Sequence, residues 1–128
     1  MNLLLDTHTV LWFFKDDPLL SAQAKALIED PGNRKLVSIA SCWETAIKAG
    51  IGKLNLAEPA KTLLSREIAR NNFELLAISL DHATEVETLP QHHRDPFDRL
   101  LIAQALLENL PIVSVDAIFD KYKVQRLW

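Results

Sequence analysis

Short, mostly apolar runs alternate along this chain with longer segments of helical periodicity. The runs lie at 2–5, 35–38, 74–78, 111–115 and 124–127. They are continuous and do not alternate apolar with polar residues, which is typical of strands that are covered on both faces. The pattern therefore predicts five strands, the last of them short and at an edge.

The segments between these runs carry the start and stop signals of helices. Ser21 is in position to cap a helix that runs to Asp30, and Gly50 follows a helix predicted over 41–49. Prolines predict the first turns of two more helices, at 59–71 and 95–109, and we expect shorter helices at 7–14 and 81–89. Strands that alternate with helices pair in parallel through right-handed crossovers, so the sequence predicts an α/β fold in one domain, residues 1–128.

Composition narrows the class of protein. The chain has 128 residues, of which 48% are apolar, and a net charge of -3, so it is too apolar and too evenly charged to be disordered. Its one cysteine, Cys42, excludes an internal disulfide framework and fits a reducing, cytoplasmic location. No apolar run approaches the ~20 residues of a membrane span. The charge balance argues against holding nucleic acid by bulk positive charge.

Four acids stand at the ends of predicted elements. Asp6 and Asp116 directly follow the first and fourth strands, Glu44 lies one turn into the helix after the second strand, and Asp98 lies in the first turn of the helix before the fourth. Ligands of open α/β sheets bind beyond the carboxyl ends of the strands, and this topology can gather all four carboxylates there. Such a cluster is unstable without a cation or a proton. Mg²⁺ or Mn²⁺ suits it, and would support hydrolysis of a phosphodiester.

Local structural roles compete with this interpretation. Asp6 and Asp116 could each cap the segment that follows them. Ser41-x-x-Glu44 has the form of a capping box, and Glu44 could pair with Lys48 one turn later.

Asp98 has a similar alternative. In Asp95-Pro96-Phe97-Asp98, the first residue reads as an N-cap, Pro96 as the first helical residue, and Asp98 as an acid that favours the helix amino terminus. None of the four acids settles the matter alone.

Several segments resemble the PIN domain family, and more narrowly the VapC-type toxins of toxin–antitoxin pairs. These are residues 1–8, 38–48 with Trp43-Glu44, 93–105 and 112–116. The resemblance covers essentially the whole chain. It implies a Rossmann-like three-layer sandwich with a central parallel sheet of about five strands, Mg²⁺- or Mn²⁺-dependent ribonuclease activity, a homodimer, and a small cognate antitoxin that blocks the active site.

Carried over position by position, the resemblance makes Asp6, Glu44, Asp98 and Asp116 the catalytic, metal-binding acids. Ser114 stands where the family often has threonine, so it keeps the supporting hydroxyl. Thr7 is a second candidate for support by hydrogen bonding. Asp95 is an ambiguous fifth acid, because its capping role already explains it.

Four further residues lie close to the acids in sequence and could contact RNA: His93, Arg94, Arg99 and Lys48. His93 could instead orient Asp98 or lie solvated in a loop, and the basic residues could form ordinary ion pairs. The spacing of His8, His92 and His93 does not favour a zinc site. Trp12 and Trp43 are patterned as core or dimer contacts.

The leading hypothesis is a metal-dependent endoribonuclease that acts as a toxin, with RNA and an antitoxin as partners. The alternative is a non-catalytic PIN-fold module that binds RNA or a protein partner. A third possibility is phosphomonoester hydrolysis with Asp6 as nucleophile, but that chemistry usually needs an acid two residues on, where this chain has His8.

Overall fold

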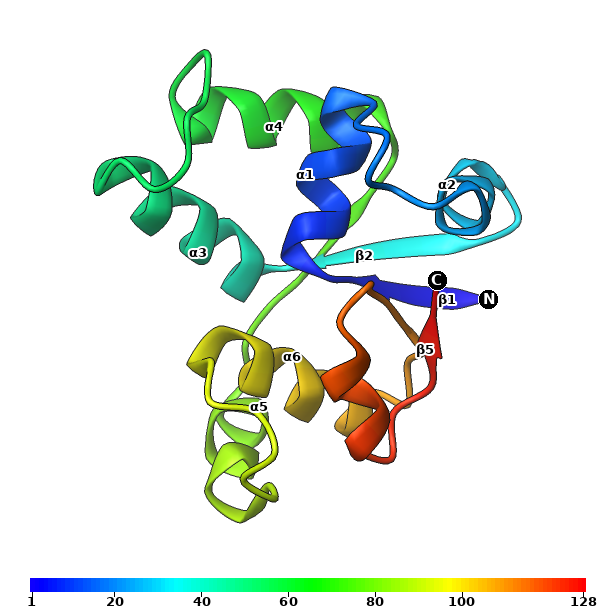
Figure 1. Ribbon diagram of the computed structural model, residues 1–128, viewed down its shortest axis with the longest axis vertical. Coiled ribbons are helices and arrows are strands. Elements are labelled where there is room, and N and C mark those ends of the chain that lie inside the picture. The colour runs from blue at the N-terminus through cyan, green and yellow to red at the C-terminus, as the bar shows by residue number, and fades with distance from the viewer.

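Five parallel strands form one central sheet in the computed structural model, which describes residues 1–128 (Figure 1). They are β1 (Asn2–Leu5), β2 (Arg34–Ser38), β3 (Glu74–Leu76), β4 (Ile112–Val113) and β5 (Arg126–Leu127). The order is β3-β2-β1-β4-β5, and every neighbouring pair is parallel. The strand order reverses between β1 and β4, which is where ligands of such sheets bind. The predicted parallel α/β fold is confirmed, although β3 and β4 are shorter than the apolar runs that predicted them.

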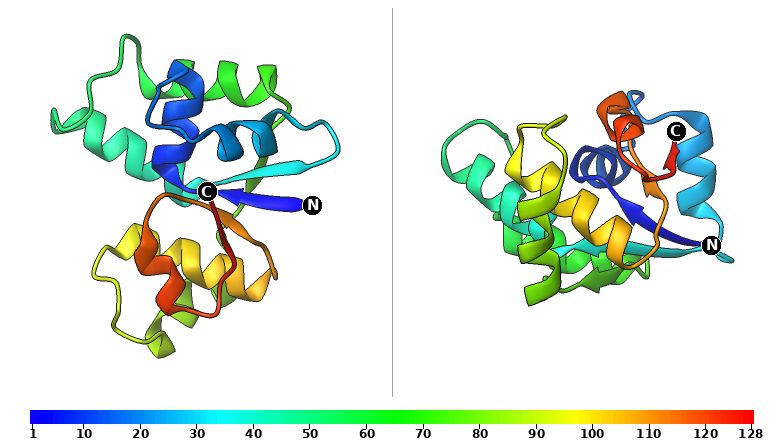
Figure 2. Two further views of the ribbon diagram at one scale, coloured as in Figure 1. Left: turned by 45° about the vertical axis from the view of Figure 1, so that its right-hand side comes forward. Right: turned by 90° about the horizontal axis from the view of Figure 1, so that it is seen from below.

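Helices cover both faces of this sheet. They are α1 (Thr7–Lys15), α2 (Ala22–Glu29), α3 (Ile39–Gly50), α4 (Ala60–Arg70), α5 (Leu80–Glu85) and α6 (Pro96–Leu107), with 3₁₀ turns η1 (Val86–Thr88) and η2 (Ala117–Lys121). In Figure 1, α1 and α4 lie above the sheet, and α5 and α6 lie below it; Figure 2 shows the same separation after rotation. None of the helices combines the length and apolar character needed to cross a bilayer.

Alternate residues of the central strands pack into two separate hydrophobic cores, one on each face of the sheet. Leu4 and Ile112 face the side of α6 and pack with Leu101, Ile102 and their neighbours. Leu3, Leu5, Val37 and Val113 point to the other side and pack against α1 and α2. Both faces of the central strands are therefore buried, which explains their continuous apolar runs and confirms the three-layer arrangement.

Helix α3 begins earlier than its sequence predicts. Its N-cap is Ser38, whose hydroxyl accepts a hydrogen bond from the Ala40 N–H at 3.0 Å, so the last residue of β2 also starts the helix. Ser41 lies inside the helix, and the predicted capping box with Glu44 is wrong. The helix also includes Gly50, and the positive φ falls two residues later, at Gly52.

Two other expectations change. The predicted helix at 81–89 divides into α5 and η1. Trp43 is not in the core: it is exposed, and its ring makes a T-shaped contact with that of Phe97 from α6, with 5.4 Å between centroids. Trp12 is half-buried against Trp128.

Candidate metal centre

Asp6 and Asp116 lie beyond the two strands between which the strand order reverses. Each caps the segment that follows it, as the local interpretation predicted: Asp6 accepts the Thr7 N–H at 2.7 Å, and Asp116 accepts the Ile118 N–H at 3.0 Å. In each carboxylate the cap uses only Oδ1. The Oδ2 atoms have other partners, so capping does not exclude a second role for either acid.

Ser114 connects these two acids. It is completely buried. Its hydroxyl donates to Asp6 Oδ2 at 2.7 Å and accepts the backbone N–H of Asp116 at 3.0 Å. Thr7 is also buried, but its hydroxyl donates to Ser41 at 2.9 Å, which joins the start of α1 to α3. Ser114 therefore supports the acids directly, and Thr7 supports them through its backbone N–H and through helix packing.

Glu44 brings a third carboxylate from α3. Its side chain is almost fully buried, and Oε2 pairs with Lys48 Nζ at 2.6 Å, which raises the pKa of Lys48. The other oxygen, Oε1, is buried without any hydrogen-bond partner. An unsatisfied buried carboxylate oxygen is costly, and a bound cation is one way to satisfy it.

Asp98 completes the cluster from the first turn of α6. Burial, together with the negative charges of Asp6, Asp95, Glu44 and Asp116, raises the pKa of its carboxyl to about 8. Burial also raises the pKa of Asp6. The fold has therefore brought the predicted acids into one electrostatic neighbourhood, where Asp98 retains a proton at neutral pH unless a cation replaces it.

Asp95 has the capping role that its sequence predicted. Its Oδ1 accepts the N–H groups of Phe97 and Asp98, at 2.8 and 3.3 Å. The cap fixes the first turn of α6, and so fixes the direction in which Asp98 leaves the helix.

His93 is buried, so the solvated loop position that its sequence context favoured is wrong. Its Nε2 lies 2.9 Å from Asp98 Oδ2 and 3.0 Å from Asp116 Oδ2, and its Nδ1 accepts the Asp95 N–H at 3.2 Å. Since Nδ1 accepts, the ring proton is on Nε2 and lies between the two carboxylates. The ligand atoms of His93, Asp98 and Asp116 all lie within 4.8 Å of one another.

The remaining basic candidates differ in their surroundings. Lys48 pairs with Glu44, as its i, i+4 spacing predicted. Arg99 donates to the backbone carbonyls of Val86 and Pro90, at 2.9 and 3.0 Å, so its guanidinium holds the segment before α6. Arg94 is exposed.

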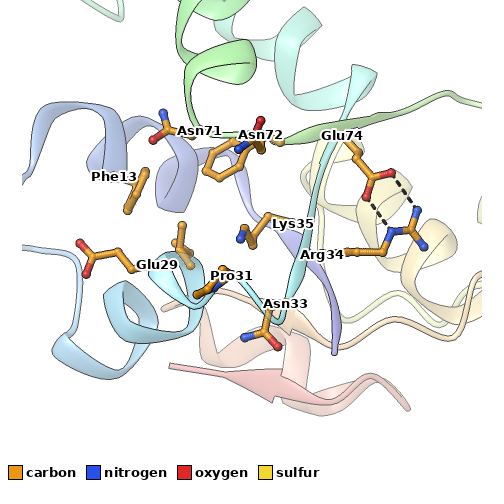
Figure 3. Close-up of a pocket in the computed structure, with 11 residues that line it drawn as sticks. Phe13, Glu29, Pro31, Asn33, Arg34, Lys35, Asn71, Asn72 and Glu74 are labelled. Carbon is orange, nitrogen blue, oxygen red and sulfur yellow. Dashed lines mark hydrogen bonds and ion pairs between the residues drawn. The ribbon is translucent and has the colours of Figure 1, made fainter.

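A pocket lies at the opposite, amino-terminal edge of the sheet (Figure 3). Its volume is about 480 Å³. The charged groups that line it already have partners: Arg34 pairs with Glu74 at 2.7 Å, and Lys35 Nζ donates to the Asp30 carbonyl at 3.1 Å. No cluster of acids lines it, so it does not carry the chemistry that the sequence suggested.

The sequence matches the PIN domain family over residues 3–125. The chain therefore belongs to the PIN domain family, and its sheet and helices are those of that α/β fold. A comparison with curated proteins gives no match.

Three solved structures have a similar fold. A chain of VapBC2 from Rickettsia felis, bound to a DNA fragment from its promoter, is similar with a TM-score of 0.70 and 18% identity, over 99% of this chain and 98% of that one. A toxin–antitoxin complex from Klebsiella pneumoniae gives 0.65 and 20%, over 98% and 95%. FitAcB from Neisseria gonorrhoeae gives 0.65 and 18%, over 98% and 96%.

Proposed function

We propose that this protein is a Mg²⁺- or Mn²⁺-dependent endoribonuclease and the toxin of a toxin–antitoxin pair. The observation that carries the proposal is the convergence of four buried or half-buried acids at the reversal of strand order, with one carboxylate oxygen unsatisfied and the pKa of Asp98 raised to about 8. Carboxylates under such repulsion fit a hard divalent cation.

In this proposal Asp6, Glu44, Asp98 and Asp116 hold the ion. When bound, the ion supplies Lewis-acid stabilisation of the phosphodiester undergoing hydrolysis. Ser114 keeps Asp6 in place through its 2.7 Å hydrogen bond. Asp95 sets the first turn of α6 from which Asp98 projects.

The toxin assignment has separate support. The chain is a PIN domain, and chains with its fold occur in the VapBC2 and FitAcB structures, the first of which is a complex bound to DNA. We infer that a small antitoxin binds this protein in the cytoplasm and blocks the acids, and that the protein is a homodimer. These inferences rest on family likeness, whereas the metal-dependent nuclease also rests on the geometry of the acids.

Cleavage of a long single-stranded RNA by the purified protein tests the nuclease directly. We expect cleavage with Mn²⁺ or Mg²⁺, none in chelator, and a loss of at least a hundredfold in Asp6→Asn and Asp98→Asn. Asp81→Asn is the matched control, because Asp81 is an exposed acid of α5 whose side chain forms no hydrogen bond or ion pair with the residues of the metal centre. Cleavage that survives chelator, or that both site variants retain, contradicts the proposal.

One observation favours the non-catalytic alternative. Lys48 already pairs with Glu44, and the His93 ring N–H already lies between Asp98 and Asp116, so the chain offsets part of the negative charge itself. A calorimetric titration with Mn²⁺ separates the two functions. Binding that Asp98→Asn abolishes supports the nuclease, whereas the absence of binding supports a module that recognises RNA or protein without chemistry.

A further inference from the structure

A small basic pocket lies against the cluster of acids. Its volume is about 340 Å³. Two lysines, Lys48 and Lys53, line it together with His8, Thr7 and Thr45, and two leucines complete the wall; no acidic residue is among them. We call it the lysine pocket.

The chain itself places this pocket beside the candidate metal centre. Thr7 directly follows Asp6, and Lys48 is paired with Glu44 at 2.6 Å. The turn after α3 then folds back, because the Lys53 N–H donates to the Lys48 carbonyl at 2.9 Å. Lys53 is thereby brought beside the carboxyl-terminal end of α3, where Lys48 lies.

Within the pocket, Lys53 is the cation available to a ligand. The charge of Lys48 is largely offset by Glu44, whereas Lys53 is exposed and forms no ion pair within 4.0 Å. The two threonine hydroxyls are already donors to Ser41, at 2.9 Å to its hydroxyl and 2.8 Å to its carbonyl. A ligand anion would therefore meet one free ammonium group in a wall that contains no carboxylate.

We propose that the lysine pocket binds a backbone phosphate of single-stranded RNA, next to the phosphodiester that is cleaved. This assignment rests on the proposed function and adds a substrate contact to it. With a net charge of -3, the protein cannot hold RNA by its overall field, so a local cation beside the acids is needed to position the strand.

The aromatic surroundings favour nucleic acid over a free anion. His8 is exposed and stacks on Trp12, with ring centroids 5.6 Å apart and an interplanar angle of 27°. Unpaired bases stack on such surfaces while a lysine contacts the adjoining phosphate. A free phosphate ion would gain nothing from this aromatic pair.

The salt dependence of RNA binding tests the pocket without relying on cleavage. A fluorescent single-stranded RNA is titrated with Asp98→Asn protein at constant Mg²⁺ over a series of KCl concentrations. Each phosphate contact in a single strand contributes about 0.7 to the slope of log Kd against log salt. Lys53→Ala should lower the slope by about 0.7 and weaken binding about fivefold at ~0.1 M salt.

Two variants control for charge and position. Lys53→Arg keeps the cation and should keep the slope. Lys123→Ala removes an exposed lysine that lines a different pocket, near the amino-terminal end of β4. This variant should also leave the salt slope unchanged. Equal thermal midpoints would show that all variants are folded. If Lys53→Ala and Lys123→Ala give the same slope, the lysine pocket is not a phosphate site.

Failure of the phosphate site can be distinguished from failure of the proposed nuclease function. If the wild-type protein cleaves RNA but Lys53→Ala leaves the salt slope of RNA binding unchanged, the proposed nuclease function stands and the phosphate site in the lysine pocket is refuted. If the wild-type protein does not cleave RNA but Lys53→Ala still loses one phosphate contact, the nuclease function is refuted and the lysine pocket stands as an RNA-binding site.

Discussion

Binding of Mn²⁺ should displace a proton from Asp98, and the size of this effect follows from its raised pKa. With a pKa of about 8, roughly nine-tenths of the Asp98 carboxyls are protonated at pH 7. An ion that needs the carboxylate must remove that proton. We therefore expect about 0.9 proton to be released per ion at pH 7, and an apparent affinity that rises about fiftyfold between pH 6 and pH 8.

An aspartate with the ordinary pKa of 3.8 would give a different result. It would be ionised throughout this range, so it would release almost no proton and its affinity for Mn²⁺ would be nearly flat. Calorimetric titration in two buffers with different enthalpies of ionisation measures the released protons directly. Proton release below about 0.2 at pH 7, together with an affinity that changes less than twofold, would refute the electrostatic reasoning.

Three further predictions concern the residues around the centre. Without metal, the raised pKa of Asp98 gives a contribution to stability that is complete below about pH 4 and is lost as the pH rises toward 8, at up to about 1.4 kcal/mol per pH unit. The free energy of urea unfolding should fall along this slope in the wild type and along a shallower one in Asp98→Asn, where the raised pKa of Asp6 still contributes. His93→Ala should weaken Mn²⁺ binding about 10- to 100-fold because it removes the N–H that lies between two carboxylates. His93→Gln keeps an N–H donor and should recover part of the loss. Equal Mn²⁺ affinities in the wild type and both variants would exclude a positioning role for His93. Arg99→Ala should lower the free energy of unfolding by about 1–3 kcal/mol, since it leaves backbone carbonyls before α6 unpaired. Its Mn²⁺ affinity in calorimetry should stay close to that of the wild type. Unchanged stability with a weakened Mn²⁺ affinity would instead place Arg99 in the metal centre.

Much of the fold could be predicted because the central strands are buried on both faces. Their continuous apolar runs identify strands, and their alternation with helices requires parallel pairing. The convergence of the acids follows from the same topology: Asp6 and Asp116 come after neighbouring parallel strands, so they reach the same edge of the sheet.

Contacts that depend on tertiary packing could not be predicted in this way. His93 lies in a polar stretch, and the acids that its ring contacts become neighbours only when α6 and η2 are in place. Arg99 follows Asp98 directly, but successive residues on a helix point about 100° apart, so its guanidinium turns toward the segment before α6.

Helix caps show a related limit. Ser38 and Ser41 are both acceptable N-caps by residue type, and the choice falls on Ser38 because α3 begins directly at the end of β2, without a loop. The start of α3 matters for the site, since it places Glu44 in the second turn of the helix. In that position one carboxylate oxygen pairs with Lys48 and the other is left unsatisfied.

The most direct test of the metal centre is an anomalous difference map from crystals of the protein soaked in Mn²⁺. The predicted result is a peak among the carboxylates of Asp6, Glu44, Asp98 and Asp116, with Glu44 Oε1 no longer without a partner. Fully occupied Mn²⁺ at other surface acids, with no peak among these four, would contradict the assignment of this edge of the sheet as a divalent-ion site.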